Sequence, residues 1–94
     1  MRLIVVYDIS DNTDRLRLAD RLKALGLVRV QRSAFVGRGG VAVAKDVVRS
    51  CSRYVRGESD SLIVFVVPNA SVRGAFVVGT PMAPLEGERA YAVV

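Results

Sequence analysis

The carboxylate of Asp8 is the side chain in this sequence best placed to do chemistry. It follows an apolar run over residues 3–7 and precedes a polar segment, so it stands where an expected strand opens into a loop. A carboxylate there can bind Mg²⁺, which takes one or two carboxylates together with water and substrate phosphate oxygens. Asp8 can also cap the following helix or accept hydrogen bonds from loop amides, and the residues alone favour this structural role.

The composition removes several other kinds of active site. The chain has no histidine, which excludes Ser-His-Asp triads, Cys-His dyads, histidine general bases and histidine zinc sites. Its single cysteine, Cys51, can form neither an internal disulfide nor a cysteine-based zinc site, and we expect it to be a buried small side chain. A two-fold dimer would supply a second copy of Asp8, and a bound cation would offset the repulsion between the two carboxylates.

Two more acidic residues, Asp11 and Asp14, follow Asp8 closely. We expect Asp11 or its neighbour Asn12 to cap the helix, and Asp14 to complement the positive end of that helix from its first turn. A supporting role for Asp11 or Asp14 behind a metal ligand is the weaker interpretation.

A cluster over residues 31–35 has side chains that suit nucleic acid. Gln31, Arg32, Ser33 and Phe35 bring an amide, a guanidinium, a hydroxyl and an aromatic ring together, and such groups contact phosphates and stack on bases. The alternative is that Gln31 and Ser33 satisfy a bent strand and that Phe35 fills the core. We expect Phe35 in the core, whereas for Arg32 and Ser33 the two interpretations are even.

Positive charge is concentrated in the first part of the chain. Residues 1–56 carry twelve Lys or Arg against five Asp, whereas residues 57–94 carry two Arg against four acids. Twelve of the fourteen basic residues are arginines, whose planar guanidinium suits phosphate, so the charge indicates either a polyanionic partner or a solvated basic surface. The glycine-rich residues 37–40 lack the Lys-Ser/Thr of a phosphate-binding P-loop and are interpreted as a flexible turn.

The strands expected from the sequence would place Asp8 and the 31–35 cluster. Residues 3–7 and 62–67 are continuous β-branched runs, typical of central strands. Residues 28–36 are expected to be extended, as a bent strand or a hairpin, with a kink or bulge near Arg32 and Ser33. Shorter strands are expected over residues 74–79 and 91–94.

Two amphipathic helices are expected between these strands. The first covers residues 13–25 and ends at Gly26, with Leu18, Ala19, Leu22 and Leu25 on its apolar side. The second covers residues 41–55 and carries a basic stripe at spacings of four, four and three. Its apolar stripe is Val41, Ala44, Val48, Cys51 and Val55, and its basic stripe is Lys45, Arg49, Arg53 and Arg56.

This order of elements predicts an α+β fold. It matches a ferredoxin-like βαββαβ sandwich, one antiparallel sheet with two helices on one face, with an extra short C-terminal strand. A chain of 94 residues with 51% hydrophobic residues is enough for one domain, which a dimer would stabilise further. The early carboxylate of Asp8 argues against a signal peptide, and no apolar stretch is long enough to span a bilayer, so we expect a cytoplasmic protein.

Three segments of the chain form a recognisable series. The first is the apolar run that ends in Tyr7, Asp8, Ile9, Ser10 and Asp11, with Arg15 soon after. The second is residues 25–27 followed by residues 30–35, and the third is residues 84–86 with residues 91–94 at the end. Taken in order, these segments resemble the CRISPR-associated protein 2 family over nearly the whole chain, whereas residues 37–40 and 69–80 depart from the family's pattern.

The resemblance implies a ferredoxin-like homodimer in which C-terminal residues, about 80–94, reach onto the partner. It also implies that Asp8 of each subunit faces the other and holds Mg²⁺ or another divalent cation. Members of the family are described as metal-dependent endonucleases on single-stranded RNA, and some on double-stranded DNA. The family also bridges dimers of the CRISPR-associated integrase during the acquisition of new spacers.

Two main hypotheses follow. In the first, the protein hydrolyses phosphodiesters with Asp8 holding the metal ion, and Arg15, Arg32 and Ser33 position the phosphate. In the second, it is a non-catalytic scaffold that binds duplex DNA. A ferredoxin-like regulatory domain that binds a small ligand, and an RNase toxin on a related fold, are further alternatives. The residues that would contact the DNA backbone in the scaffold are Arg15, Arg17, Lys45, Arg49 and Arg53.

Overall fold

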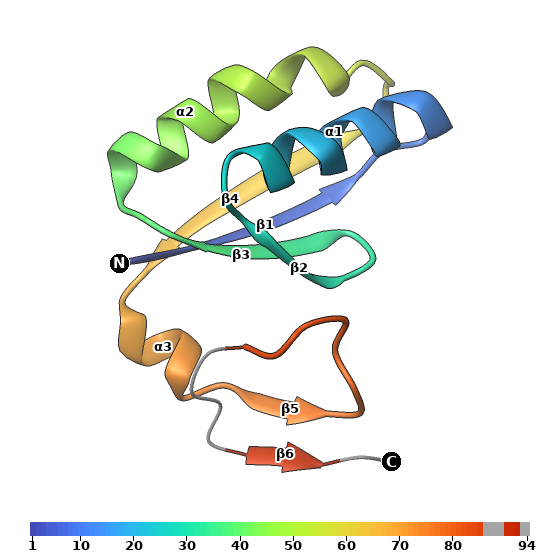
Figure 1. Cartoon of the computed structure of the whole chain (residues 1–94). Helices are drawn as coiled ribbons and strands as arrows, with labels where there is room; N and C mark the ends of the chain where they lie inside the picture. Colours follow the sequence, from blue (N-terminus) through green and yellow to red (C-terminus); the bar gives the residue numbers. More distant parts are fainter. Residues whose placement is uncertain (86–89, 93–94) are drawn as a thin grey trace.

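A four-stranded antiparallel sheet in the order β2-β3-β1-β4 forms the centre of the molecule (Figure 1). The computed structural model describes residues 1–85 and 90–92. Helices α1 (Asn12–Ala24) and α2 (Val41–Cys51) lie together on one face of the sheet. This confirms the ferredoxin-like βαββαβ arrangement. The strands of the sheet are β1 (Arg2–Asp8), β2 (Val28–Gln31), β3 (Ala34–Arg38) and β4 (Ser61–Val67).

The hydrophobic core lies between the sheet and the two helices. Alternate residues of β1, Leu3, Val5 and Tyr7, point into it because successive side chains of a strand face opposite ways. Phe35 of β3 and Cys51 of α2 are fully buried, which confirms both predictions. Burial raises the pKa of the Cys51 thiol, although the nearby charges of Arg21 and Arg53 act in the opposite direction.

Helix α1 is capped as its sequence predicts. The carboxylate of Asp11 accepts a hydrogen bond from the backbone N–H of Asp14 at 2.9 Å, so Asp11 is the N-cap. Gly26 follows the helix with φ +89°, a conformation that suits glycine and ends the helix. Leu18 and Leu22 are fully buried, whereas Leu25 is 36% exposed and lies at the edge of the core.

The second helix is shorter than expected and is rotated relative to its predicted apolar stripe. It ends at Cys51 and continues as a 3₁₀ helix, η1 (Ser52–Tyr54). Val47 is fully buried, whereas the expected core residues Val41 and Val48 are 61% and 48% exposed. Because Val47 and Val48 are adjacent in the sequence, the apolar pattern fits either rotation, and only packing on the sheet decides between them.

Strand β4 was expected to be central, and this is wrong. It is an edge strand that pairs with β1 alone in the four-stranded sheet, whereas β1 is central as predicted. The run over residues 62–67 is apolar on both faces, which is typical of a central strand. Here Val64 and Val66 pack against the core, whereas Ile63 and Phe65 are 49% and 48% exposed on the opposite face.

Residues 28–36 form a hairpin, because the expected kink is a full reversal at Arg32 and Ser33. The register of β2 against β3 shifts between Arg29 and Gln31, as it does at a β-bulge. Strand β3 then continues to Arg38, further than the sequence indicated. At Gly37 an added Cβ would lie 2.7 Å from Cγ of Leu27, so glycine allows β3 to pass close to this core side chain.

The C-terminal part of the chain lies on the face of the sheet opposite to α1 and α2 (Figure 1). A short helix that the sequence did not predict, α3 (Asn69–Arg73), leads into β5 (Phe76–Val78), which pairs in parallel with β6 (Ala90–Ala92). Strand β5 confirms, at reduced length, the strand expected over 74–79. Residues 93 and 94 of the expected last strand lie outside the described residues.

The connection after β5 is attached to the edge of the sheet. The backbone N–H of Met82 donates a hydrogen bond to the carbonyl oxygen of Val30 in β2 at 2.8 Å. The expected reach of residues 80–94 onto a second subunit stays a prediction. Within the described residues, no helix is long and apolar enough to cross a membrane.

Candidate nucleic-acid site at the end of the central strand

The fold brings the β2–β3 turn beside the end of β1, where Asp8 lies. Asp8 is the last residue of β1 and pairs in register with Ser61 of β4. On the other side of β1, the backbone N–H of Tyr7 donates to the carbonyl oxygen of Ser33 at 3.1 Å. Asp8 is therefore held between two neighbouring segments that are far from it in sequence.

A surface groove of about 710 Å³ opens at this point. Its lining contains three arginines, Arg15, Arg29 and Arg32, together with Asp8 and Ser33. Four residues singled out in the sequence, Asp8, Arg15, Arg32 and Ser33, thus lie around one groove. Two exposed apolar side chains, Leu16 and Met82, also line it and are 66% and 60% exposed.

The Asp8 carboxylate is exposed to solvent at this groove. Within the part of the chain that the structure describes, it has no hydrogen-bond or ion-pair partner, and the helix-capping role belongs to Asp11. An exposed carboxylate without such partners can accept a cation or a hydrogen-bond donor.

Arg15 is attached to the loop that follows Asp8. Its Nη1 donates a hydrogen bond to the carbonyl oxygen of Ile9 at 2.9 Å, and its Nη2 contacts the side-chain oxygen of Asn12. These bonds hold the guanidinium at the groove with part of its hydrogen-bonding capacity still available, since arginine has five N–H donors.

The sequence reasoning missed Arg29. Its Nη2 donates to the hydroxyl oxygen of Tyr7 at 3.4 Å, and its guanidinium carbon lies 5.2 Å from the centre of the Phe35 ring. Its Nε is buried and has no hydrogen-bond partner among the described residues. The position of Arg29 beside Tyr7 depends on the hairpin and its bulge, which the sequence did not specify in advance.

A second carboxylate, Asp60, braces the loop after Asp8. Its Oδ1 accepts hydrogen bonds from the Ser10 backbone N–H at 2.9 Å and the Ser10 hydroxyl at 2.8 Å, and its Oδ2 accepts one from the Gly57 N–H at 2.9 Å. The pKa of Asp60 is lowered, chiefly by the bond from the Ser10 N–H and then by the other two, because these donors favour the ionised carboxylate.

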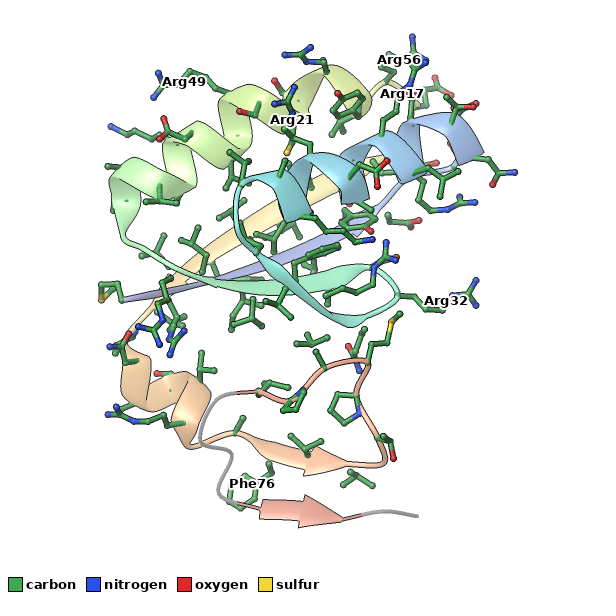
Figure 2. The ribbon with its side chains drawn as sticks, viewed as in Figure 1. Arg17, Arg21, Arg32, Arg49, Arg56 and Phe76 are labelled. Carbon is green, nitrogen blue, oxygen red and sulfur yellow. The ribbon has the colours of Figure 1, made fainter. Side chains whose placement is uncertain are left out.

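The other predicted phosphate contacts lie away from the Asp8 groove. Figure 2 shows Arg17, Arg21 and Arg49 projecting from the helices, on the opposite side of the sheet from β5, whereas Arg32 lies at the tip of the hairpin. Lys45 and Arg49 line a shallow surface on α2 beside Val64 of β4, and Arg53 lies over the Tyr54 ring.

Asp14 has a structural partner rather than a role in the groove. It is 3% exposed, and both of its oxygens accept hydrogen bonds from the Arg56 guanidinium, at 3.0 and 3.1 Å. Arg56 therefore does not continue the expected basic stripe as a free cation, because it ties the chain after α2 to the start of α1.

The donor set of one chain fits a magnesium ion only in part. No group of three or more acidic, cysteine or histidine side chains gathers within residues 1–85 and 90–92. Asp8 is the one carboxylate among the described lining of the groove. One carboxylate is enough to bind Mg²⁺ in part, because this ion commonly takes one or two carboxylates and fills its remaining positions with water and phosphate oxygens.

The described residues thus form a ferredoxin-like domain with an exposed carboxylate at the end of β1 and three arginines around one groove. The comparison with known families is specific. Residues 1–74 match the family described as "CRISPR associated protein Cas2", and the chain belongs to this family.

Several named relatives align over most of the chain. The "CRISPR-associated endoribonuclease Cas2" of Aeropyrum pernix is 34% identical over 97% of each chain, and that of Thermofilum pendens is 39% identical over 99% of each. A "CRISPR-associated endonuclease Cas1/endonuclease Cas2 fusion" of Thermoproteus tenax is 43% identical over 77% of this chain and 27% of its own length.

Solved structures agree with the fold. A crystal structure of a Cas2 protein superimposes with a TM-score of 0.72 at 30% identity, over 92% of this chain and 94% of its own. The crystal structure of a hypothetical protein from Thermus thermophilus gives a TM-score of 0.64 at 34% identity, over 71% and 80%.

Proposed function

We propose that this protein is a metal-dependent endoribonuclease of the cytoplasm that works as a homodimer and takes part in acquiring new CRISPR spacers. The observation that carries the proposal is the Asp8 groove, which combines a carboxylate without a partner among the described residues with three arginines. The names of the relatives, which describe endoribonucleases, support the type of substrate.

Each residue of the groove has a role that follows from its chemistry. Asp8 holds a divalent cation, and in a two-fold dimer the same residue of the second copy adds another carboxylate. A bound Mg²⁺ supplies charge neutralisation at the phosphate and lowers the pKa of a coordinated water. Arg29 and Arg32 donate hydrogen bonds to phosphate oxygens, and Arg15 keeps the loop after Asp8 in place.

The hydrolysis needs no histidine under this proposal. The arginines of the groove are positively charged hydrogen-bond donors, so they stabilise the negative charge that develops on the phosphate. Tyr7, whose hydroxyl donates to the carbonyl oxygen of Arg32 at 3.3 Å and accepts from Arg29, orients both sides of the groove.

A second function, a DNA-binding scaffold for the integrase, is favoured by a different observation. Arg17, Arg21 and Arg49 project from the helices rather than into the Asp8 groove, where they could contact a duplex backbone (Figure 2). A relative in which Cas1 and Cas2 are fused supports partnership with that integrase. In this function Asp8 is dispensable.

The test compares the protein with its Asp8→Ala variant on single-stranded RNA and on duplex DNA, each with Mg²⁺ and with a chelator. We expect cleavage of RNA that needs both Mg²⁺ and Asp8, with a loss of at least about 100-fold in the variant. If neither protein cleaves and both bind duplex DNA, the scaffold is the function. Equal cleavage by both proteins would place the active site elsewhere.

A further inference from the structure

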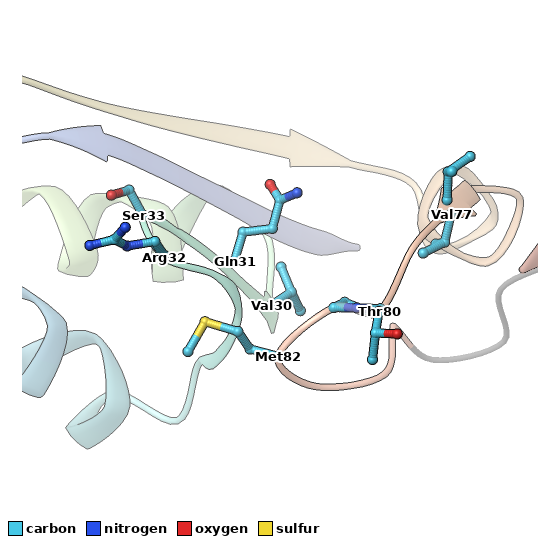
Figure 3. Close-up of a pocket in the computed structure, with 9 residues that line it drawn as sticks. Val30, Gln31, Arg32, Ser33, Val77, Thr80 and Met82 are labelled. Atoms are coloured by element: carbon cyan, nitrogen blue, oxygen red, sulfur yellow. The ribbon is translucent and has the colours of Figure 1, made fainter. Parts of the chain in front are cut away.

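A second groove, of about 550 Å³, lies next to the Asp8 groove at the turn of the hairpin, on the face of the sheet opposite to α1 and α2. It runs between the β2–β3 hairpin and residues 77–82, as Figure 3 shows. Cavities of this size are typical of sites for small organic groups.

The two grooves adjoin and share three lining residues. Arg32, Ser33 and Met82 line both, so the two grooves meet at the hairpin turn and a chain bound at Asp8 would pass this turn to enter the second groove. In Figure 3, Met82 lies between Arg32 and the segment that carries Thr80.

The chemistry of the lining changes from one groove to the next. Beyond the shared Arg32, the described residues of the second groove carry no charge. They are the aliphatic Val30, Val77, Val78 and Pro81 and the neutral hydrogen-bonding Gln31 and Thr80. A neutral, half-apolar groove is a poor site for phosphate, but it suits a flat heterocycle with polar edges.

Resting on the function proposed above, we propose that this second groove binds an unpaired nucleobase of single-stranded RNA, next to the phosphate at Asp8. The aliphatic side chains contact the face of the base, and the Gln31 amide and the Thr80 hydroxyl reach its hydrogen-bonding edge. Because a base in a duplex is stacked and paired, it cannot enter, so the groove selects single strands.

The outer wall of this groove is built by backbone features. Gly79, with φ +86°, turns the chain after β5, and the bond from the Met82 N–H to the Val30 carbonyl holds the returning segment against β2. Thr80 and Met82 are exposed, so changing them leaves the core intact.

The test measures binding in the presence of a chelator, so that no RNA is cleaved. The probes are a single-stranded RNA oligomer, an oligomer of the same length with abasic sugars, and the RNA annealed to its complement. The variant is Gln31→Ala with Met82→Ala. The control is Asn69→Ala with Val41→Ala, at two exposed residues that line neither groove.

We expect the unchanged protein and the control to bind the RNA about tenfold or more tightly than the abasic oligomer, and to bind the duplex like the abasic one. We expect the groove variant to bind all three probes at the abasic level. If the unchanged protein binds RNA and abasic oligomer equally, or if the groove variant keeps the preference, the base site is refuted and the phosphate site stands. If no probe binds, the base site is refuted, whereas the metal-dependent cleavage is decided separately by the comparison with Asp8→Ala.

Discussion

Asp60 holds the loop that follows Asp8 in place, through its hydrogen bonds from Ser10 and Gly57. Its lowered pKa means that the folded state binds this proton more weakly than the unfolded chain does. Asp60 therefore stabilises the fold above the unfolded pKa, near 3.9, and this stabilisation is lost as the pH falls through the lower folded value. We expect Asp60→Asn to be less stable than the unchanged protein at pH 7, with the difference shrinking towards pH 2.

Urea unfolding followed by circular dichroism at several pH values measures this difference. The neighbouring Ser59→Ala, an exposed change without a charge, is the control and should alter stability little at any pH. A difference between Asp60→Asn and the unchanged protein that is the same at pH 7 and at pH 2 would show that the carboxylate charge is not what braces the loop.

At the level of single residues, most of the polar residues that line the groove were predictable from the sequence, but Arg29 was not. Asp8 stands out because it is a carboxylate at the point where an apolar strand opens into a loop, a common place for ligand sites. Arg32 and Ser33 stand out because they interrupt an extended segment. Arg29 lies within an alternating stretch and resembles any strand residue, and the bulge in β2 that brings it to Tyr7 is a property of pairing that local pattern does not encode.

At the level of elements, the Asp14–Arg56 pair joins the first turn of α1 to the chain after α2. The Asp14 side chain is 5% exposed and the Arg56 side chain is 69% exposed, with a closest N–O distance of 2.9 Å. Removing Arg56 leaves a buried carboxylate without this partner, whereas the arginine left by removing Asp14 can turn to water. We expect Arg56→Ala to cost about 2 kcal/mol of stability and Asp14→Asn less.

Thermal and urea unfolding of the two variants measure this asymmetry. Arg49→Ala is the matched control, because its partner Asp46 lies 3.3 Å away on the surface with both side chains well exposed, so a loss under about 0.5 kcal/mol is expected. Equal losses of unfolding free energy for Arg56→Ala and Arg49→Ala would show that the burial of Asp14 does not strengthen its ion pair.

The strands and helices were predictable from their apolar patterns, except where one pattern is compatible with two arrangements. The βαββαβ order was predictable because each strand and helix has its own apolar repeat. The rotation of α2 was not, because Val47 and Val48 are both apolar. Helix α3 was missed, since five residues are too few to show a helical repeat. Strand β4 was assigned to the interior because its sequence is apolar on both faces, although its position is at the edge.

At the level of the whole molecule, the apolar outer face of β4 supports the proposed homodimer. Ile63 and Phe65 leave about half of their surface exposed, which is costly for a single small domain in water. We expect the protein to sediment as a dimer and Phe65→Glu to raise the dimer dissociation constant by about 100-fold or more, because a charge would be buried at the contact.

Analytical ultracentrifugation over a range of concentrations measures the mass of both proteins. Val48→Glu, a change at a similarly exposed valine on α2, is the control and should leave the dimer intact. A monomer at every concentration, or a dimer that Phe65→Glu does not weaken, would exclude this face as the interface.

One side of the candidate site belongs to a strand of the sheet, and the other side belongs to an irregular connection. Asp8 belongs to a strand that pairs on both sides, so it cannot be displaced without disturbing the whole sheet. Met82 lies on an irregular connection, with its backbone bonded to Val30. Descendants of this chain can therefore lengthen, shorten or replace that connection, and acquire new ligand preferences, while the reaction centre and the fold remain those of the ancestor.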